Sequence, residues 1–285
     1  MRLRTALELG DIVDADDALE RCAALAGDLR QPFYMWQTLV FRATMAIAEG
    51  RLAEGEQLAL KAFELGQRVA PLPATTALGA HLALHRLLTG RIEEILPRMK
   101  DRAESLPGEP VWRAGVAWWC AEAGREAEAR AEFERLAAAG FARLPRNGNW
   151  LASVNLLGRV CGLLDDAERA SELHDLLLPY GGRSVISGTG AFRGSSNSAV
   201  LGVLAATMER FDEAVSYFEE ALQRDATTRT WSWRVFTARD YARMLLTRQG
   251  AGNVERAREL INEALRTAHA AGMTVLARQL EGLFP

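Results

Sequence analysis

The glycine-rich segment Pro179–Ser198 (PYGGRSVISGTGAFRGSSNS) contains the spacing that comes nearest to a phosphate-binding motif. Gly188, Gly190 and Gly194 follow the pattern GxGxxxG. A loop that cradles a dinucleotide instead follows GxGxxG between a buried strand and a helix, with an acidic residue about 20 positions later. The residues SVIS that precede the glycines are too few for such a strand. The segment is therefore a weak candidate for phosphate binding.

Two functions for this segment follow from its composition. As a structural loop between two repeats, it would place Ser195 or Ser196 where a hydroxyl can cap the next helix. As a phosphate-cradling loop, it would present Gly188, Gly190 and Arg193 to a ligand. The sequence favours the structural loop, because the other parts of a nucleotide-binding motif are missing.

Histidines and cysteines form no complete metal-binding or catalytic set. His81 and His85 lie four residues apart and share a helix face, as two metal ligands do, but no HExxH motif or third ligand accompanies them. Cys120 and Cys161 lie at matching places, four residues before two consecutive turns. Their helices should pack about 8–10 Å apart, too far for a disulfide. We expect no catalytic residue, no metal and no cofactor, and therefore a protein that is not an enzyme.

Charge and composition exclude several classes of function. The 285 residues include 34 Lys+Arg and 37 Asp+Glu, a formal net charge of -3, which argues against a general affinity for nucleic acid. No stretch reaches the roughly 18–20 uninterrupted apolar residues of a membrane span. The N-terminus MRLRTALELGDIVDADD lacks the apolar core of a signal peptide, and three cysteines are too few for a disulfide framework. We expect a cytoplasmic protein that contacts neither nucleic acid nor membrane.

A turn pattern recurs seven times along the chain. Each copy begins with a small or turn residue and a polar residue, and most copies have Ala five positions after the first residue. The copies begin at Gly10, Gly50, Gly90, Gly124, Asp165, Glu209 and Gly252. Their intervals are 40, 40, 34, 41, 44 and 43 residues. A nearly fixed period in this range is typical of a solenoid, in which each repeat packs on its neighbours.

Helical patterns flank each turn. After Glu209, the residues Ala214, Phe218, Ala221 and Leu222 fall on one face of a helix, and equivalent places after Gly124 and Asp165 are also mostly apolar. Ala, Leu, Arg and Glu dominate the composition, and these residues favour helices. We expect an all-α right-handed solenoid of about seven helix-turn-helix repeats. It would form a single domain over residues 1–285, with a Gly-rich inter-repeat loop at 179–198, and would be more elongated than a compact globule.

The pattern LG…A…ERFDEA…YF..AL resembles a tetratricopeptide repeat (TPR), although the period exceeds the 34 residues usual in that family. More specifically, three segments are similar to the C-terminal helical regions of actinobacterial ATPase-containing LuxR-type regulators and adenylate-cyclase-like signalling proteins. They are RQPFYMWQTLVFRATMAIAEGRLAEGEQLALKAFELGQ, GREAEARAEFERLAAAGFARLPRNGNWL and LLLPYGGRSVISGTGAFRGSSNSAVLGVLAATMERFDEAVSYFEEAL. The resemblance implies a regulatory role in signalling or transcription. We expect the array alone, without the ATPase, cyclase or DNA-binding modules of those proteins.

The TPR resemblance also implies where a ligand would bind, because certain first-helix places line the concave groove in that family. These places hold Trp118, Asn155, Arg159, Arg239 and Arg243. The guanidinium group of arginine can form paired hydrogen bonds with a carboxylate or a phosphate. The expected partner is therefore a protein, a peptide or a small anionic effector.

Three alternatives remain. The arginines could pair with Asp240, Glu122 or other acids and hold the repeats in register. The chain could be an enzyme or a small-molecule-binding accessory protein of a biosynthetic pathway that uses the groove and the Gly-rich loop. It could instead be an oligomerisation domain that associates through its terminal repeats, which an exposed apolar face on TVLARQLEGLF would favour.

Overall fold

At each of the seven predicted turns, the backbone adopts a left-handed conformation. The computed structural model describes residues 2–248 and 250–284. In it, the first residue of every predicted turn has a positive φ, from 52° at Asp165 to 82° at Gly10. Five of these residues are glycines, which adopt this conformation without steric cost, and the other two are Asp165 and Glu209. The sequence therefore located all seven turns correctly.

Each turn joins two helices, and the described part of the chain contains 15 α-helices. The pairs are α1 (Arg2–Leu9) with α2 (Ile12–Asp28), α3 (Pro32–Ala48) with α4 (Leu52–Val69), α5 (Pro71–Leu88) with α6 (Leu96–Ser105), α7 (Pro110–Glu122) with α8 (Glu126–Ala137), α9 (Trp150–Leu163) with α10 (Ala167–Leu177), α11 (Asn197–Thr207) with α12 (Phe211–Thr227), and α13 (Trp231–Arg248) with α14 (Asn253–Ala271). A last helix, α15 (Thr274–Glu281), follows, and short 3-10 helices lie at Ile92–Glu94, Phe141–Arg143 and Leu178–Tyr180. The expected all-α helical repeat is confirmed.

Small residues set the distance between neighbouring units. The predicted helix face Ala214, Phe218 and Ala221 is buried. On α9, Gly158 and Gly162 lie one turn apart, and a Cβ atom at either position would overlap a valine side chain of α11. The two helices therefore approach more closely than helices with larger residues at the contact could.

The Gly-rich segment forms a β-hairpin rather than an irregular loop. Strand β1 (Ser184–Ile186) pairs antiparallel with β2 (Arg193–Ser196). The hairpin reaches helices that are distant in sequence: Thr44 Oγ1 donates to the carbonyl of Gly190 (2.8 Å), and Trp233 Nε1 donates to that of Arg193 (2.6 Å). The helix-capping prediction is wrong for Ser196, which occupies the N-cap of α11 without a side-chain capping bond.

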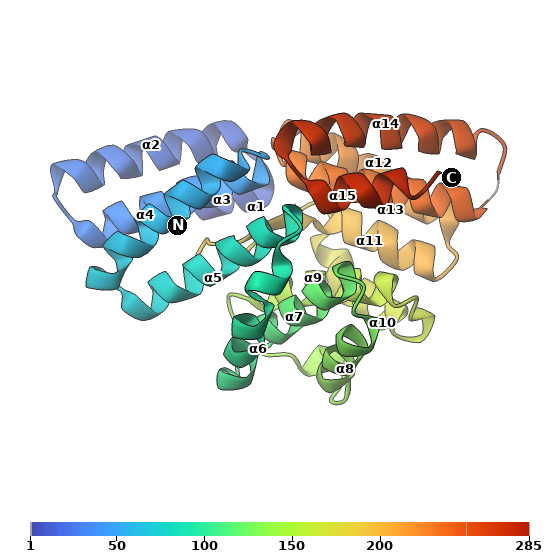
Figure 1. Ribbon diagram of the computed structural model, residues 1–285, viewed down its shortest axis with the longest axis horizontal. Coiled ribbons are helices and arrows are strands. Elements are labelled where there is room, and N and C mark those ends of the chain that lie inside the picture. The colour runs from blue at the N-terminus through green and yellow to red at the C-terminus, as the bar shows by residue number, and fades with distance from the viewer. Residues whose placement is uncertain (1, 249, 285) are drawn as a thin grey trace.

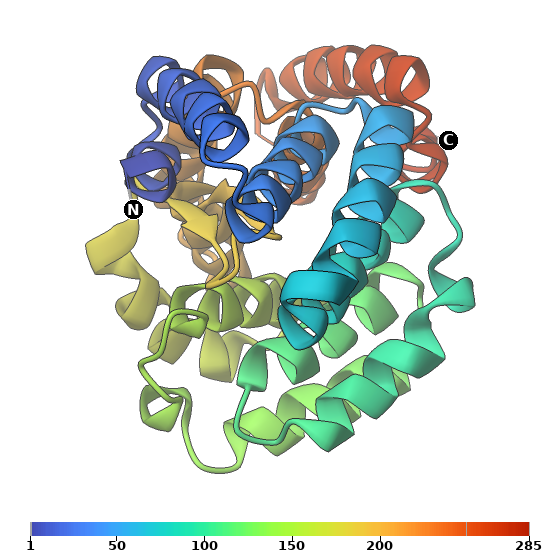
Figure 2. The same ribbon diagram turned by 90° about the vertical axis from the view of Figure 1, so that its left-hand side faces the viewer.

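The array curls until its two ends meet (Figures 1 and 2). The hydroxyl of Ser232 at the start of α13 donates to the carbonyl of Ile47 in α3 (2.7 Å), and Arg224 of α12 donates to the carbonyl of Leu9 in α1 (2.7 Å). The accessible surface is 12513 Å², close to the ~12,000 Å² that the size relation gives for a compact protein of 31.3 kDa. The expected elongated particle is therefore wrong, because end-to-end contacts and the inserted hairpin close the superhelix.

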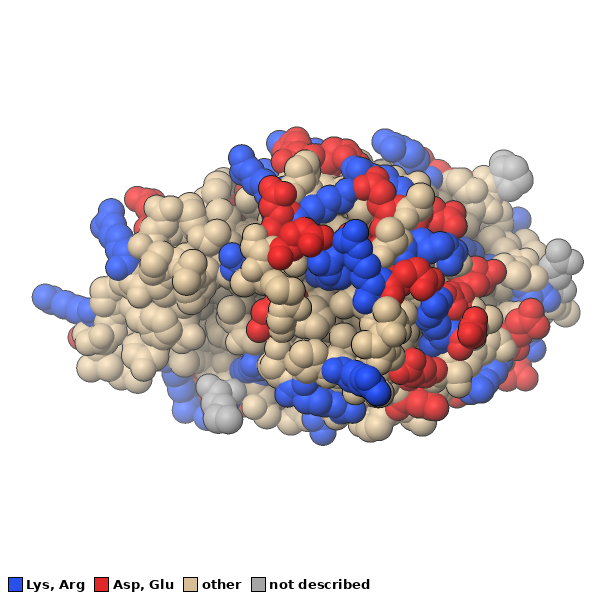
Figure 3. Space-filling model, turned by 90° about the horizontal axis from the view of Figure 1, so that it is seen from below, with Lys and Arg blue, Asp and Glu red and all other residues tan. Residues whose placement is uncertain are grey.

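The two ends of the chain differ in how their apolar faces are covered. Leu276 and Leu280 of α15 are buried, so the exposed apolar face that would favour association through this helix is not found there. By contrast, the ends of α2, α3 and α5 in the first units expose large apolar side chains, among them Leu29, Tyr34 and Leu72. Figure 3 shows that this end of the molecule, at the left, carries few charged side chains on the face it displays. Within the described residues, no helix combines the length and apolarity needed to span a bilayer.

Candidate ligand-binding site on the inner surface

The predicted groove residues converge at the centre of the closed array. Trp118 of α7, Arg159 of α9 and Arg239 of α13 are buried, as is Asn155 of α9. Arg243 of α13 differs, with a side chain that is 42% exposed. The first helices of the repeats therefore do line the inside of the array, but most of the predicted side chains point into a packed interior.

Arg239 lies between two buried carboxylates. Its Nη1 and Nη2 donate to Glu122 of α7 at 2.6 and 2.9 Å, and its Nε and Nη2 donate to Oδ1 of Asp240 at 3.0 and 2.8 Å. Trp118 Nε1 donates to the same Glu122 carboxylate (3.2 Å). This is the pairing that the sequence offered as the alternative to ligand binding, and it links α7 to α13 across the interior.

Asp240 is the point at which the three predicted arginines meet. Arg159 Nη1 and Arg243 Nη2 each lie 3.7 Å from one of its carboxylate oxygens, in addition to the bonds from Arg239. Burial opposes ionisation of Asp240, but Arg239, Arg243 and Arg159 together hold its pKa below the usual range. Arg159 also donates to Ser195 Oγ of the hairpin (2.5 Å) and lies over the Trp233 ring.

The remaining predicted residues position the hairpin. Asn155 donates to Asn197 Oδ1 (2.9 Å) at the start of α11, and Gly188 N donates to Asn149 Oδ1 (2.8 Å). Gly190 has φ 75° and packs on the Phe41 ring, where a Cβ would come within 2.5 Å. Arg193 is buried and donates to the Thr228 carbonyl (3.1 Å), which ties β2 to the end of α12.

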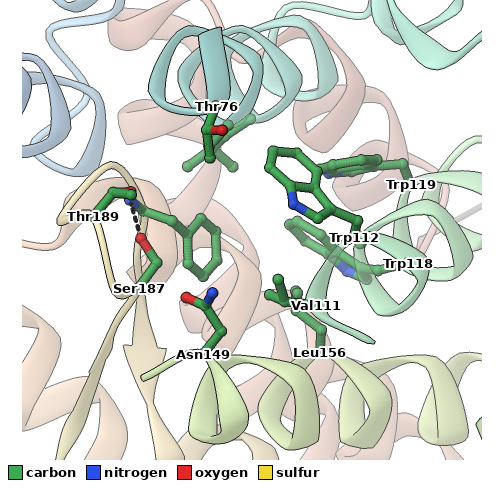
Figure 4. Close-up of a pocket in the computed structure, with 13 residues that line it drawn as sticks. Thr76, Val111, Trp112, Trp118, Trp119, Asn149, Leu156, Ser187 and Thr189 are labelled. Carbon is green, nitrogen blue, oxygen red and sulfur yellow. Dashed lines mark hydrogen bonds between the residues drawn. The ribbon is translucent and has the colours of Figure 1, made fainter. Parts of the chain in front are cut away.

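A cavity of about 70 Å³ opens beside this cluster, where α5, α7, α9 and the hairpin meet (Figure 4). We call it the aromatic pocket. Its walls carry four aromatic rings, from Trp112, Trp118, Trp119 and Phe192, together with aliphatic side chains such as Val111 and Leu156. None of the lining residues is charged. The pocket is therefore suited to an uncharged apolar group.

A few polar groups interrupt the apolar wall of the aromatic pocket. Thr76, Asn149 and Ser187 lie around the space, and the indole nitrogen of Trp112 points toward it (Figure 4). Asn149 is held in place from both sides, because its Oδ1 accepts from Gly188 N and its Nδ2 donates to Glu109 (3.1 Å). These groups give the pocket the means to orient a ligand that has one hydrogen-bonding atom.

Sequence reasoning identified Trp118 but missed Trp112, Trp119 and Phe192. Trp112 and Trp119 are seven residues apart, a spacing that places them on one face of a helix. That spacing was visible in the sequence. The contribution of Phe192 was not, because it depends on the hairpin folding back to the pocket, where Phe192 packs on Trp233 of α13.

His81 and Cys161 are buried in the interior. His81 Nε2 lies 2.7 Å from Thr44 Oγ1 in the interior, and burial lowers the pKa of His81 to about 4. Cys161 is also buried, and burial raises the pKa of its thiol to about 12, far from that of a nucleophile. In the described ranges, no group of three or more His, Cys, Asp and Glu residues could hold a metal ion.

Comparison with known proteins does not identify a family. No protein-family model matches the chain, and no curated protein matches its sequence.

Proposed function

We propose that this chain is a non-catalytic binding module of the tetratricopeptide-repeat type, whose inner surface receives a small ligand at the aromatic pocket. The observation that carries the proposal is the set of four aromatic rings around an uncharged cavity that opens on the inner face of the array. Pockets of this composition, apolar with a few placed polar groups, are the usual form of small-molecule sites. A regulatory role in signalling or transcription, and a cytoplasmic location, are further parts of the proposal that rest on the sequence.

The arrangement favours a small ligand over a long peptide. The hairpin and the Arg239 cluster fill the inside of the array, where an extended peptide would otherwise lie. The cavity of about 70 Å³ is smaller than the ~150 Å³ cavity that accommodates a benzene molecule in an engineered protein interior. It therefore encloses only part of a ring or a branched aliphatic end, with the rest of the ligand projecting through the opening. Association of the chain through its terminal repeats stays a prediction.

The proposal is tested by ligand binding to a variant with a filled pocket. The probe is 4-fluorobenzyl alcohol, a neutral ring with one hydroxyl, observed by ¹⁹F NMR. We expect saturable binding to the wild-type protein. In the Ala80→Phe variant, whose new ring would occupy the space, we expect at least a tenfold loss of affinity.

The control is Ala137→Phe, which introduces the same ring at a half-buried alanine outside the aromatic pocket. Melting temperatures of both variants show whether either is misfolded. Absence of saturable binding to the wild type, or equal affinity for the wild type and a folded Ala80→Phe variant, would contradict the proposal.

A further inference from the structure

A second cavity, of about 320 Å³, lies on the other side of Asp240, where α9, α11, α12 and α13 meet. This volume is at the lower end of the range of small-molecule sites, about 300–1,000 Å³. Val203, Phe218 and Met244 give it an apolar wall. Unlike the aromatic pocket, it is also lined by charged residues, namely Asp165, Asp240 and Arg243.

Among the three arginines around Asp240, Arg243 is the one whose guanidinium is free to bind a ligand. Arg239 contacts Glu122 and Asp240 directly, whereas Arg159 lies 3.7 Å from Asp240 and donates to Ser195 Oγ instead. Arg243 adds a fifth charge: its guanidinium lies 3.7 Å from Asp240, beyond hydrogen-bond distance, and it donates no hydrogen bond to another described residue. A guanidinium carries five N–H donors in a planar fork that matches a carboxylate. Arg243 is therefore placed to bind one.

Asp165 supplies the opposite charge. It occupies the turn after α9, is exposed, and forms no ion pair with another described residue. The last turns of α9 and α11, which contribute Leu163 and Thr207 to the cavity, present helix C-termini, and these carry a partial negative charge. This part of the lining favours a positively charged group.

We propose that this cavity binds a zwitterionic amino acid with an aliphatic side chain. Its carboxylate would pair with Arg243, its ammonium group with Asp165 and the adjacent helix C-termini, and its side chain would pack on Val203, Phe218 and Met244. A simple anion would face Asp165, and a simple amine would leave Arg243 without a partner, so a ligand with both charges complements this lining best.

The experiment uses the full chain with L-leucine as the probe, measured by isothermal titration calorimetry and by the shift in melting temperature. Two truncated analogues separate the charges: 4-methylpentanoate lacks the ammonium group, and 3-methylbutylamine lacks the carboxylate. We expect saturable binding of leucine, with both analogues bound at least tenfold more weakly. Absence of leucine binding, or an analogue that binds as tightly as leucine, overturns the proposal.

The matched variants are Arg243→Gln and Arg256→Gln, because the two arginine side chains are similarly exposed, 42% and 40%. Arg256 pairs with Glu219 on the surface and does not line the cavity. We expect Arg243→Gln to weaken leucine binding at least tenfold and Arg256→Gln to leave it unchanged; equal affinities for the two variants would refute the site. Leucine binding in the Ala80→Phe variant separates this proposal from the one for the aromatic pocket, since filling that pocket should not affect the second cavity.

Discussion

Arg239 shows why an arginine at a predicted groove position need not contact a ligand. It has the residue type and the helix position expected for ligand binding, yet Glu122 and Asp240 already occupy its donors. Its neighbour Asp240 is adjacent in sequence, so that pairing could be suspected from the sequence. Glu122 is 117 positions away and becomes a partner only when α7 and α13 meet across the interior. The sequence analysis named both acids as possible partners, and the structure shows that pairing for Arg239.

We expect Arg239→Met to destabilise the protein by about 3–5 kcal/mol, because it leaves two buried carboxylates without their main partner. The measurement is the free energy of unfolding in urea. Arg243→Gln is the control on the same helix, and it should cost less than about 1 kcal/mol, because the side chain is partly exposed and its ion pair is long. Similar losses for the two variants would show that the cluster around Arg239 does not hold the array closed.

His81 gives stability a specific dependence on pH. Burial lowers its pKa to about 4 in the folded protein, against about 6.5 in an unfolded chain. Between these values the unfolded chain binds a proton that the folded protein does not. The contribution of uncharged His81 to stability is therefore complete above pH 6.5 and is lost as the pH falls toward 4. Over this range the free energy of unfolding falls by up to about 1.4 kcal/mol per pH unit.

The variant His81→Gln keeps an amide that can donate to Thr44 but cannot titrate in this range. Urea unfolding at several pH values between 6.5 and 5 should give a smaller slope for the variant than for the wild type. The carboxylates and His85 are common to both proteins and cancel in the comparison. Parallel slopes would mean that His81 is protonated in the folded state.

The helices could be predicted from the sequence, whereas the hairpin could not. The turn residues and the apolar spacing determine the helix pairs locally, through backbone conformation and burial on neighbouring units. The strand Arg193–Ser196 has the sequence RGSS, which has little intrinsic preference for a strand. It is held by contacts to Arg159, Thr228 and Trp233, all of which lie outside the segment.

The approach of α9 to α11 provides a test of packing between units. In Gly158→Ala, the new methyl group would overlap Val200, and overpacking of this kind costs about 1–3 kcal/mol. Gly27→Ala in α2 is the matched control, since a Cβ there meets no atom within 4 Å and alanine favours the helix by up to about 1 kcal/mol. Thermal unfolding should show opposite shifts. A neutral Gly158→Ala would indicate that the two helices can move apart without loss.

For the whole molecule, closure of the array predicts a compact particle. A compact chain of 285 residues should have a radius of gyration of about 19 Å. Small-angle X-ray scattering should give this value, and chemical unfolding should show one transition, because the last units are bonded to the first. A clearly larger radius, or stepwise loss of units as in an open array, would be inconsistent with closure in solution.

Closure also determines when, during synthesis, the first and last units can contact each other. The first helices make contacts with residues far along the chain: Asp16 pairs with Arg229, 213 positions later, and Ile47 accepts a bond from Ser232, 185 positions later. At roughly 5–20 residues per second, a ribosome needs about 10–40 s to make the intervening chain. Until residues 229–232 are made, these bonds between the first and last units cannot form. The hairpin can contact α1 and α3 earlier, so closure of the array by α13 is a late step of synthesis.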